Sequence, residues 1–539
     1  MRYFFASHGP WMREIAWLVS VALALAGCTV VGPDFEKPED GPLPADWSPE
    51  ETDETTRDVS SWWKLFNDPV LDTLITKAYE QNLTLQAAGL RILQARAALG
   101  IADGLKYPQQ QAVSGNLARI YEKKDSLNSA TLVFDVGWEM DVWGKFARNI
   151  ESAEATLYAS VASYDDILVS LTAEAATNYI NYRTFQERMT LARQNIAIQQ
   201  RVVELTQAQF ESGNVSELDV QQAKTQLHTT QATLPAVTNS MINTRNALAA
   251  LLGMLPQDVE SLLAQGDKTL GEGRYQADFS DKMTRVEKSE DILTNYDKYS
   301  IVPIAPELSL MIDASLVRRR PDIQIAELLA RAQNARIGVA TAELYPSFSL
   351  FGTIGLSETV PAGSGFSFDN AVSVAAGPAF NWNIFQYGRV KNQIRVQDAL
   401  FQESLTNYND TVIRAVQEVA DALSDYQYSR VQRDYNYKAV IAAIRAFNIS
   451  VTQYNNGLVT YQRVLSTTEK MTRNEDAYAQ IKGRIATSVV AVYQALGGSW
   501  QMRTGKPFVP GSITDQMAER TDWGEFLDQE KAVPTERKP

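Results

Sequence analysis

Residues 145–211 read KFARNIESAEATLYASVASYDDILVSLTAEAATNYINYRTFQERMTLARQNIAIQQRVVELTQAQFE, a run of 67 positions with neither proline nor glycine. One continuous helix of this length would extend about 100 Å, at 1.5 Å per residue. Apolar side chains recur along it at alternating spacings of three and four, the pattern of a coiled-coil seam. The seam positions, ten of thirteen apolar, are Leu168, Leu171, Ala175, Asn178, Tyr182, Phe185, Met189, Ala192, Ile196, Gln199, Val203, Thr206 and Phe210.

The sequence Phe210-Glu211-Ser212-Gly213 closes this stretch. Glycine readily adopts the left-handed conformation that ends a helix, so Gly213 predicts a reversal of the chain. Helical composition then resumes and continues from about 215 to 252. The segment from about 145 to 252 is therefore predicted to form a long antiparallel helical hairpin.

The same pattern occurs a second time, 244 residues later. Its landmarks pair as Trp138 with Trp382, Gly144 with Gly388, Gly213 with Gly457, and Gly253 with Gly497. The shifted seam, with nine apolar positions, is Val412, Ala415, Val419, Ala422, Tyr426, Ser429, Arg433, Asn436, Val440, Ala443, Phe447, Ser450 and Tyr454. We infer two structural repeats, 62–253 and 309–497, with the second helical hairpin at about 389–496 and a non-repeated insert at 254–308.

A shorter helix precedes each predicted strand pair. Residues 69–105 are rich in Leu, Ala, Gln and Arg, and Asp68-Pro69 suits the first turn of a helix. In the second copy, Arg320-Pro321-Asp322 is likewise suited to the first turn of a helix. Pro108 and Pro346 should end these two helices, because proline disfavours helical conformation in the residue before it.

Alternating apolar and polar residues then predict strand hairpins at about 109–143 and 347–386. In the first hairpin Asp135, Glu139 and Asp141 lie opposite an apolar face. That face carries Leu132, Phe134, Val136, Trp138 and Met140. Each segment has the length of a tilted membrane strand, although a soluble sandwich would show the same alternation. The strand ends favour a membrane, since they carry the aromatic residues Trp138, Trp143, Trp382 and Tyr387.

Four strands cannot close a barrel, and an open edge in lipid leaves backbone groups unpaired at several kcal/mol each. Protomers must therefore pool their strands if these strands span a membrane. Two protomers would give eight strands, a barrel filled by side chains, and three would give twelve, which leaves a lumen. The helices are far longer than a membrane is thick, so they should cross an aqueous compartment.

Composition argues against an enzyme. The 539 residues carry a net charge of −14, which disfavours a nucleic-acid binder. There are two histidines and one cysteine, and only His228 lies outside the N-terminal region. Structural disulfides, cysteine-ligated zinc and cysteine nucleophiles are thus excluded, and we expect no metal site and no cofactor.

The N-terminus has the features of an export signal. Residues 1–27 contain basic residues and an apolar run of about eleven residues, too short to span a membrane. The run ends in Leu25-Ala26-Gly27-Cys28, which resembles the bacterial lipoprotein box. That resemblance implies cleavage after Gly27 and a diacylglycerol on Cys28, followed by a lipidated segment at 28–61. The alternative is an ordinary cysteine beside a simple signal. Thr29 rather than Asp follows, which by resemblance implies the outer membrane.

The chain as a whole resembles outer-membrane efflux lipoproteins of the TolC/OprM/NodT type. Besides the lipoprotein box and the duplicated glycine turns, the residues that carry the resemblance are Val31-Gly32-Pro33-Asp34-Phe35, Trp62-Trp63-Lys64-Leu65-Phe66-Asn67-Asp68-Pro69 and Arg319-Arg320-Pro321-Asp322-Ile323. The resemblance implies a mainly α fold with a membrane β-barrel part: a homotrimer with a twelve-stranded barrel continuous with a twelve-helix barrel. It also implies an equatorial domain from the N-terminal segment, the insert and residues 498–539, and a periplasmic adaptor and inner-membrane pump as partners.

In this family acidic residues constrict the periplasmic end, after the turn of the second copy. Here the corresponding positions are Arg463 and Ser466, so the sequence departs from the pattern. The first copy offers Glu217 and Asp219 after Gly213. Asp219 paired with Arg463 is one candidate constriction, and ordinary solvated tip residues are the alternative. His228 is expected on a helix surface without a role.

The function expected is a passive exit duct of a tripartite efflux system, anchored by lipid in the outer membrane and extending into the periplasm. The strand alternation would direct Asp135, Glu139 and Asp141 into its lumen, which predicts a preference for cations. A non-conducting coiled-coil envelope lipoprotein is the main alternative, and a secreted glycosidase with paired carboxylates is a further one. These features do not specify the exported compound, since selection mostly occurs at the pump. The charged tail from about 501 is expected to be partly ordered at best.

Overall fold

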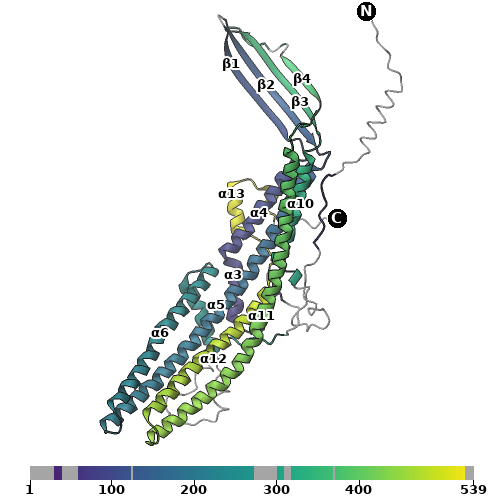
Figure 1. The fold of residues 1–539 in the computed structure, drawn as a ribbon. Coiled ribbons are helices and arrows are strands. Elements are labelled where there is room, and N and C mark those ends of the chain that lie inside the picture. The colour runs from purple at the N-terminus through teal and green to yellow at the C-terminus, as the bar shows by residue number, and fades with distance from the viewer. Residues whose placement is uncertain are drawn as a thin grey trace, which may run out of the picture.

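The computed structural model describes residues 30–38, 59–122, 125–271, 300–308, 317–367, 369 and 371–528. An antiparallel sheet forms one end of the molecule, and long helices extend from it toward the other end (Figure 1). In chain order the elements of the first copy are η1 (Trp62–Phe66), α3 (Pro69–Gln81), α4 (Leu83–Gly104), β1 (Gln110–Glu122), β2 (Asp125–Met140), α5 (Lys145–Glu211) and α6 (Glu217–Leu251).

The insert contributes α7 (Pro256–Gly271), and the second copy follows. It comprises α10 (Pro321–Ala342), β3 (Ser347–Pro361), β4 (Val372–Asn381), α11 (Arg389–Asn455) and α12 (Tyr461–Ala495). The C-terminal segment adds η2 (Trp500–Arg503), α13 (Gly511–Arg520) and η3 (Gly524–Leu527).

The duplication predicted from the sequence is confirmed in three dimensions. Helices α5 and α11 both have 67 residues, and α6 and α12 both have 35. Gly213 and Gly457 follow the two long helices with φ angles of +77° and +69°, the left-handed conformation that glycine adopts without strain. In each copy the long helix and its return helix form the expected antiparallel hairpin (Figure 1).

The prediction of one helix over 69–105 is wrong, because the chain breaks at Asn82. The Asn82 side chain accepts a hydrogen bond from the Leu85 amide at 2.7 Å and donates one to the Leu251 carbonyl at 2.8 Å. Asparagine favours such caps over a helix interior, so α3 ends and α4 begins at this residue. In the second copy α10 matches α4, with 22 residues in each helix.

The sheet has the order β1-β2-β3-β4, so β1 and β4 are its free edges in the single chain. Directly opposed residues share a face in an antiparallel pair. Phe134 pairs with Val113 and Ile354, and Ile354 pairs in turn with Val374, which makes one face apolar across all four strands. Asp135 pairs with Ala112 and Thr353 on the other face. The alternation predicted from the sequence is therefore confirmed.

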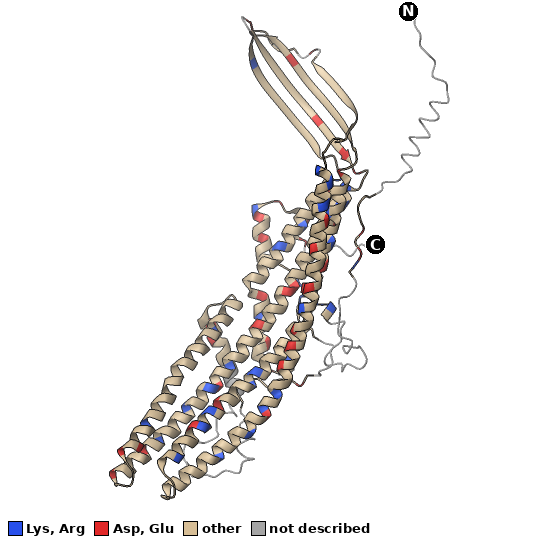
Figure 2. Cartoon of the chain, in the orientation of Figure 1, with Lys and Arg blue, Asp and Glu red and all other residues tan. Residues whose placement is uncertain are grey.

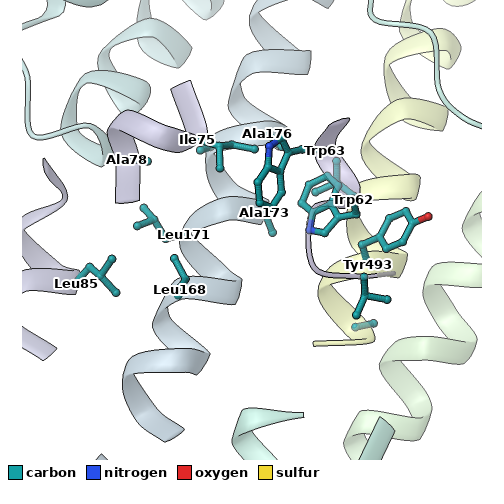
Figure 3. Close-up of a cluster of buried hydrophobic side chains, with 14 of the residues drawn as sticks. Trp62, Trp63, Ile75, Ala78, Leu85, Leu168, Leu171, Ala173, Ala176 and Tyr493 are labelled. Carbon is teal, nitrogen blue, oxygen red and sulfur yellow. The ribbon is translucent and has the colours of Figure 1, made fainter. Parts of the chain in front are cut away.

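The main core lies where α3, α4, α5 and α12 meet, with η1 inserted between them. Trp62 is buried and stacks on Tyr493 of α12, with ring centroids 5.6 Å apart. Figure 3 shows Trp62 and Trp63 beside Ala173 and Ala176 of α5. The small residues on α5 leave room for the indole rings, which explains why two tryptophans stand together at 62–63.

A second core runs toward the tips of the helical hairpins. It contains residues of α5, α6, α11 and α12, among them Val203, Leu227, Phe447 and Tyr461. In α11 the predicted seam is buried from Val412 to Tyr454, except at Arg433 and Asn436. Polar residues at these two positions interrupt the apolar seam about halfway along the helix.

No single helix in the described part of the chain is long and apolar enough to cross a membrane. The bent pair formed by Glu217–Leu251 and Pro256–Ala264 meets the length and composition test only when both are taken together.

The C-terminal segment is described as far as residue 528, and the rest of the tail lies outside the described residues. Arg96 of α4 donates hydrogen bonds at 2.7 Å to the carbonyls of Phe526 and Asp528, and its guanidinium lies over the Phe526 ring. Arg503 forms an ion pair with the buried Asp165 of α5. These contacts attach residues 500–528 to the first copy.

We predict that Gly483→Ala destabilises the contact between α5 and α12. A Cβ at Gly483 would overlap the Thr184 side chain, and overpacking of this kind costs about 1–3 kcal/mol. Thermal unfolding of the detergent-extracted protein should show a lower midpoint for the variant. The added change Thr184→Gly should restore most of the loss, and equal midpoints for Gly483→Ala and wild type would contradict the close approach.

Candidate functional site

The polar face of the sheet carries two of the acids singled out in the sequence. Asp135 and Glu139 lie on this face of β2, opposite Thr353 and Ser349 of β3. Glu139 lies 3.5 Å from the Lys145 ammonium group, whereas the described residues give Asp135 no ion pair. Figure 2 shows charged residues spread along the helices but sparse on the sheet. The two carboxylates are thus prominent charges on a face of small and polar side chains.

Asp141 has a different environment from the other two acids. Its two carboxylate oxygens accept hydrogen bonds from the Phe146 and Ala147 amides, at 3.0 and 2.8 Å. These amides are in the first turn of α5, where backbone N–H groups lack partners within the helix. Asp141 therefore caps α5, and strand alternation alone gave no signal of this.

The candidate tip residues lie around the two turns. Asp219 is in the first turn of α6 and accepts hydrogen bonds from the backbone amide and the hydroxyl of Ser216, at 3.0 and 2.8 Å. Glu217 and Arg463 are exposed, and Ser466 is half-buried. No ion pair joins Asp219 to Arg463 within the described residues. Asp219 thus has a capping role, and the constriction remains a prediction.

Polar contacts join α5 to α12 above the tips. Glu187 and Lys482 form a largely buried ion pair, and Glu187 also accepts from the Ile301 amide at 2.9 Å. Arg188 binds Asp476 through two hydrogen bonds of 2.6 and 3.1 Å. Because these residues come from different copies and from the insert, the sequence repeat gave no indication of the pairing.

The Arg319-Arg320-Pro321-Asp322 motif forms a junction between α10, α11 and α12. Arg320 donates to both carboxylate oxygens of Asp322 at 3.0 and 2.8 Å, to Glu418 at 2.6 Å and to the Ala495 carbonyl at 2.6 Å. Burial, together with the charge of Asp322, raises the pKa of the nearby Asp166 to about 6, although Arg320 opposes this. One buried guanidinium therefore holds three helices and affects a fourth.

The N-terminal strap, residues 30–38, lies against both copies. The Val31 amide donates to the Trp143 carbonyl at 3.1 Å, at the end of the sheet nearest the helices. Arg148 of α5 donates to Asp34 at 2.7 Å, and Asn334 of α10 donates to the Pro33 carbonyl at 2.9 Å. A Cβ at Gly32 would overlap the backbone of α10, so only glycine permits this fit. Cys28 and the signal at 1–27 lie outside the described residues.

Catalytic and metal-binding arrangements are not evident in the described ranges. They contain no group of three or more His, Cys, Asp or Glu residues that could hold a metal ion. His228 is at an exposed site on α6, and its Nδ1 lies 3.0 Å from the Gln231 side chain. The described arrangement is a sheet with one polar and one apolar face, joined to helices about 100 Å long.

Known proteins share this arrangement. The sequence profile of the family described as "Outer membrane efflux protein" matches residues 74–254 and 314–498. The chain belongs to this family. The two matched segments correspond to the two structural copies, and the members of this efflux family are channels that act as exit ducts in the outer membrane.

Individual relatives extend the match to most of the chain. Nodulation protein T of Rhizobium leguminosarum bv. viciae is 27% identical, over 89% of this chain and 92% of its own length. The probable outer membrane lipoprotein SilC of Salmonella typhimurium is 25% identical, over 89% of this chain and 98% of its own. The solved outer-membrane channel OprN is 28% identical with a TM-score of 0.73, and the match covers 87% of this chain and 99% of OprN. This outer membrane efflux protein therefore has the fold of these channels along nearly its full length.

We predict that Asp166→Asn alters the pH dependence of stability. The pKa of Asp166 is higher in the folded protein than the unfolded value near 4, so the folded state binds more protons between about pH 4 and 6. The stability contributed by this group is therefore greatest at low pH and falls as pH rises through that window.

Because Asn does not ionise, the variant should be more stable than wild type at pH 7.5, by about 1–2 kcal/mol after allowance for solvent screening. At pH 4.5 the difference should be smaller. Thermal unfolding at both pH values measures this, with the exposed Asp398→Asn as the control. A difference of the same size at both pH values would contradict the shifted pKa.

Proposed function

We propose that this efflux channel is a homotrimeric exit duct, which receives small molecules from a periplasmic adaptor and an inner-membrane pump and releases them outside the cell. The main support for this proposal is that a sheet with one apolar face is joined to helices long enough to cross the periplasm. A non-conducting coiled-coil spacer in the periplasm would leave the apolar face of the sheet exposed to water. The main alternative is therefore less well supported.

The apolar face of the sheet has the height of a membrane-spanning band. On β2 it extends from Ala130 to Met140, which is about 33 Å along the strand at 3.3 Å per residue. A strand tilt near 40° reduces this to about 25 Å, the band typical of outer-membrane barrels. Tyr121 lies above the band, and Trp138 and Trp382 lie at its lower end. Aromatic residues at both limits support a lipid-facing surface.

The free edges support the trimer. Strands β1 and β4 have no neighbours on their outer sides in the single chain, and lipid would require those backbone groups to be paired. Pairing β4 of one chain with β1 of the next would give the backbone groups of both edge strands hydrogen-bond partners. Three chains paired in this way would leave room for a lumen. Helix α11 likewise exposes apolar residues away from its core, with Tyr428 and Tyr435 both 68% exposed. These residues would cover the neighbouring chain.

The strap supports the lipid anchor. Cys28 is two residues before Val30, which contacts the junction between β2 and α5, so the Cα atom of Cys28 is no more than about 7 Å from that of Val30. That junction is at the lower limit of the proposed membrane band. A diacylglycerol on Cys28 would therefore enter the inner leaflet beside the barrel.

The two helical turns would form the periplasmic tip, where the adaptor and pump dock. Of the four candidate constriction residues, Glu217 and Arg463 are exposed and free to meet a neighbouring chain. Asp219 and Ser466 would act beside them, although Asp219 is committed to capping α6. A ring of alternating charges at this level would keep the duct closed until the partners engage.

Lumen charge supports a preference for cations. Asp135 and Glu139 lie on the face opposite the lipid band, so a trimer would present each of them three times. Rings of carboxylates attract cations and repel anions. Asp141, a candidate from the sequence, would contribute less, because both its oxygens accept backbone hydrogen bonds.

We predict that the detergent-extracted protein has three times the mass of one chain. Light scattering coupled to size exclusion, corrected for bound detergent, measures it. A stable monomer or dimer would argue against the tube.

We predict that Cys28→Ala abolishes incorporation of labelled palmitate, because the thiol is the attachment point. The variant should still fractionate with the outer membrane, since the strands provide their own attachment. Wild-type protein that takes up no label would exclude the lipoprotein assignment.

We predict a cation-selective reversal potential across a KCl gradient in a planar bilayer. The double variant Asp135→Asn with Glu139→Gln should move this potential toward zero, because it removes the lumen charges. Asp515→Asn in α13, away from the sheet, is the control. Anion selectivity of the wild type at low salt would contradict the assigned strand facing. Screening should weaken the preference at 1 M salt, where the Debye length is about 3 Å.

A further inference from the structure

Phe351 departs from the strand alternation of β3. It lies two residues before Thr353 and therefore on the polar face, with Asp135 and Glu139, rather than on the apolar face. Its side chain is 46% exposed in the single chain. A large aromatic ring on a face otherwise rich in serine, threonine, alanine and glycine needs an explanation, because the lipid band does not provide one.

Glycines stand opposite Phe351 on both neighbouring strands. It pairs with Gly137 of β2 and with Gly377 of β4. A Cβ at Gly377 would lie 3.7 and 3.8 Å from Cε1 and Cζ of the ring, which is ordinary contact distance. The ring therefore leans over Gly377 of β4, a residue that has no side chain to oppose it.

Two carboxylates lie on β2, the neighbour of β3 on the side away from β4. Asp135 and Glu139 are two residues before and after Gly137 on β2, so both are diagonal neighbours of Phe351 on one face. Diagonal neighbours in an antiparallel pair are about 7–8 Å apart, within the reach of one small organic molecule. Phe351 is thus flanked diagonally by two acids on β2, while its ring leans toward β4.

This combination matches the chemistry of organic cations. A cationic group is attracted to the face of an aromatic ring, and carboxylates on the neighbouring strand add charge attraction. Asp135 supplies most of it, because Lys145 lies 3.5 Å from Glu139. Quaternary ammonium groups are bound in this way, because they are weakly hydrated and carry apolar substituents. An inorganic cation would gain from the acids but little from the ring, and a neutral compound would gain from the ring alone.

We propose that Phe351, Asp135 and Glu139 form a transit site for amphipathic organic cations in the lumen of the barrel. The proposal rests on the proposed function, since it requires the polar face to line a channel. Three copies would place three rings at one height, close to the end of the barrel that joins the helices. The site would bind weakly, so that substrates pass rather than remain.

The test is block of potassium current by tetrabutylammonium in planar bilayers. Phe351→Leu keeps an apolar side chain of similar size but removes the aromatic face, and it should weaken block about tenfold. Thr353→Ala is the matched control, because Thr353 is the next residue of β3 on the same face. This change should leave block unchanged. Asp135→Asn with Glu139→Gln should also weaken block and should reduce the added effect of Phe351→Leu.

Calorimetric titration of tetrabutylammonium into detergent-extracted protein gives a second measurement that needs no open tip. The affinity order should be wild type and Thr353→Ala above Phe351→Leu. Equal affinity in wild type and Phe351→Leu would overturn the site and show that the ring only packs over the glycines. A protein that binds the probe but never conducts would instead count against the proposed function.

Discussion

The packing of α5 is the interaction on which the rest of the structure depends. This helix contacts α3, α4, α6, α10 and α12, whereas α11 packs mainly on α10 and α12. Its buried residues therefore lie on several faces rather than in one stripe, and small ones such as Ala173 and Ala176 admit the tryptophans of η1. If α5 were displaced, the strap, the C-terminal segment and the second copy would all lose their attachment. The position of α5 therefore determines where the helical tips lie relative to the sheet.

Features set by local periodicity could be predicted from the sequence. The two long helices, the glycine turns and the two-faced strands follow from spacings of 3.6 and 2 residues and from the special conformations of glycine and proline. The break at Asn82 was missed because its cause is a hydrogen bond to Leu251, a residue far away in the chain. The capping role of Asp141 was missed because this residue follows the end of β2, and its partners are backbone amides at the start of the next helix.

Contacts between the two copies could not be predicted at all. The repeat indicates which residues correspond, but not which residues meet. The Glu187–Lys482 and Arg188–Asp476 pairs join positions that do not correspond in the repeat. Their polarity contrasts with the apolar seams inside each hairpin. The sequence suggested a pairing of Asp219 with Arg463 at the tips. The ion pairs between α5 and α12 instead lie closer to the sheet.

The strap has a consequence for the order in which the chain matures. Pro33 accepts a hydrogen bond from Asn334, and only glycine fits at position 32 against the backbone of Gly338. The strap thus needs a surface that is synthesised about 300 residues later. Contacts between such distant parts of a chain form late, because a long loop must first be closed. The strap is therefore synthesised well before the surface that it binds, and it closes over the two copies only after both have folded.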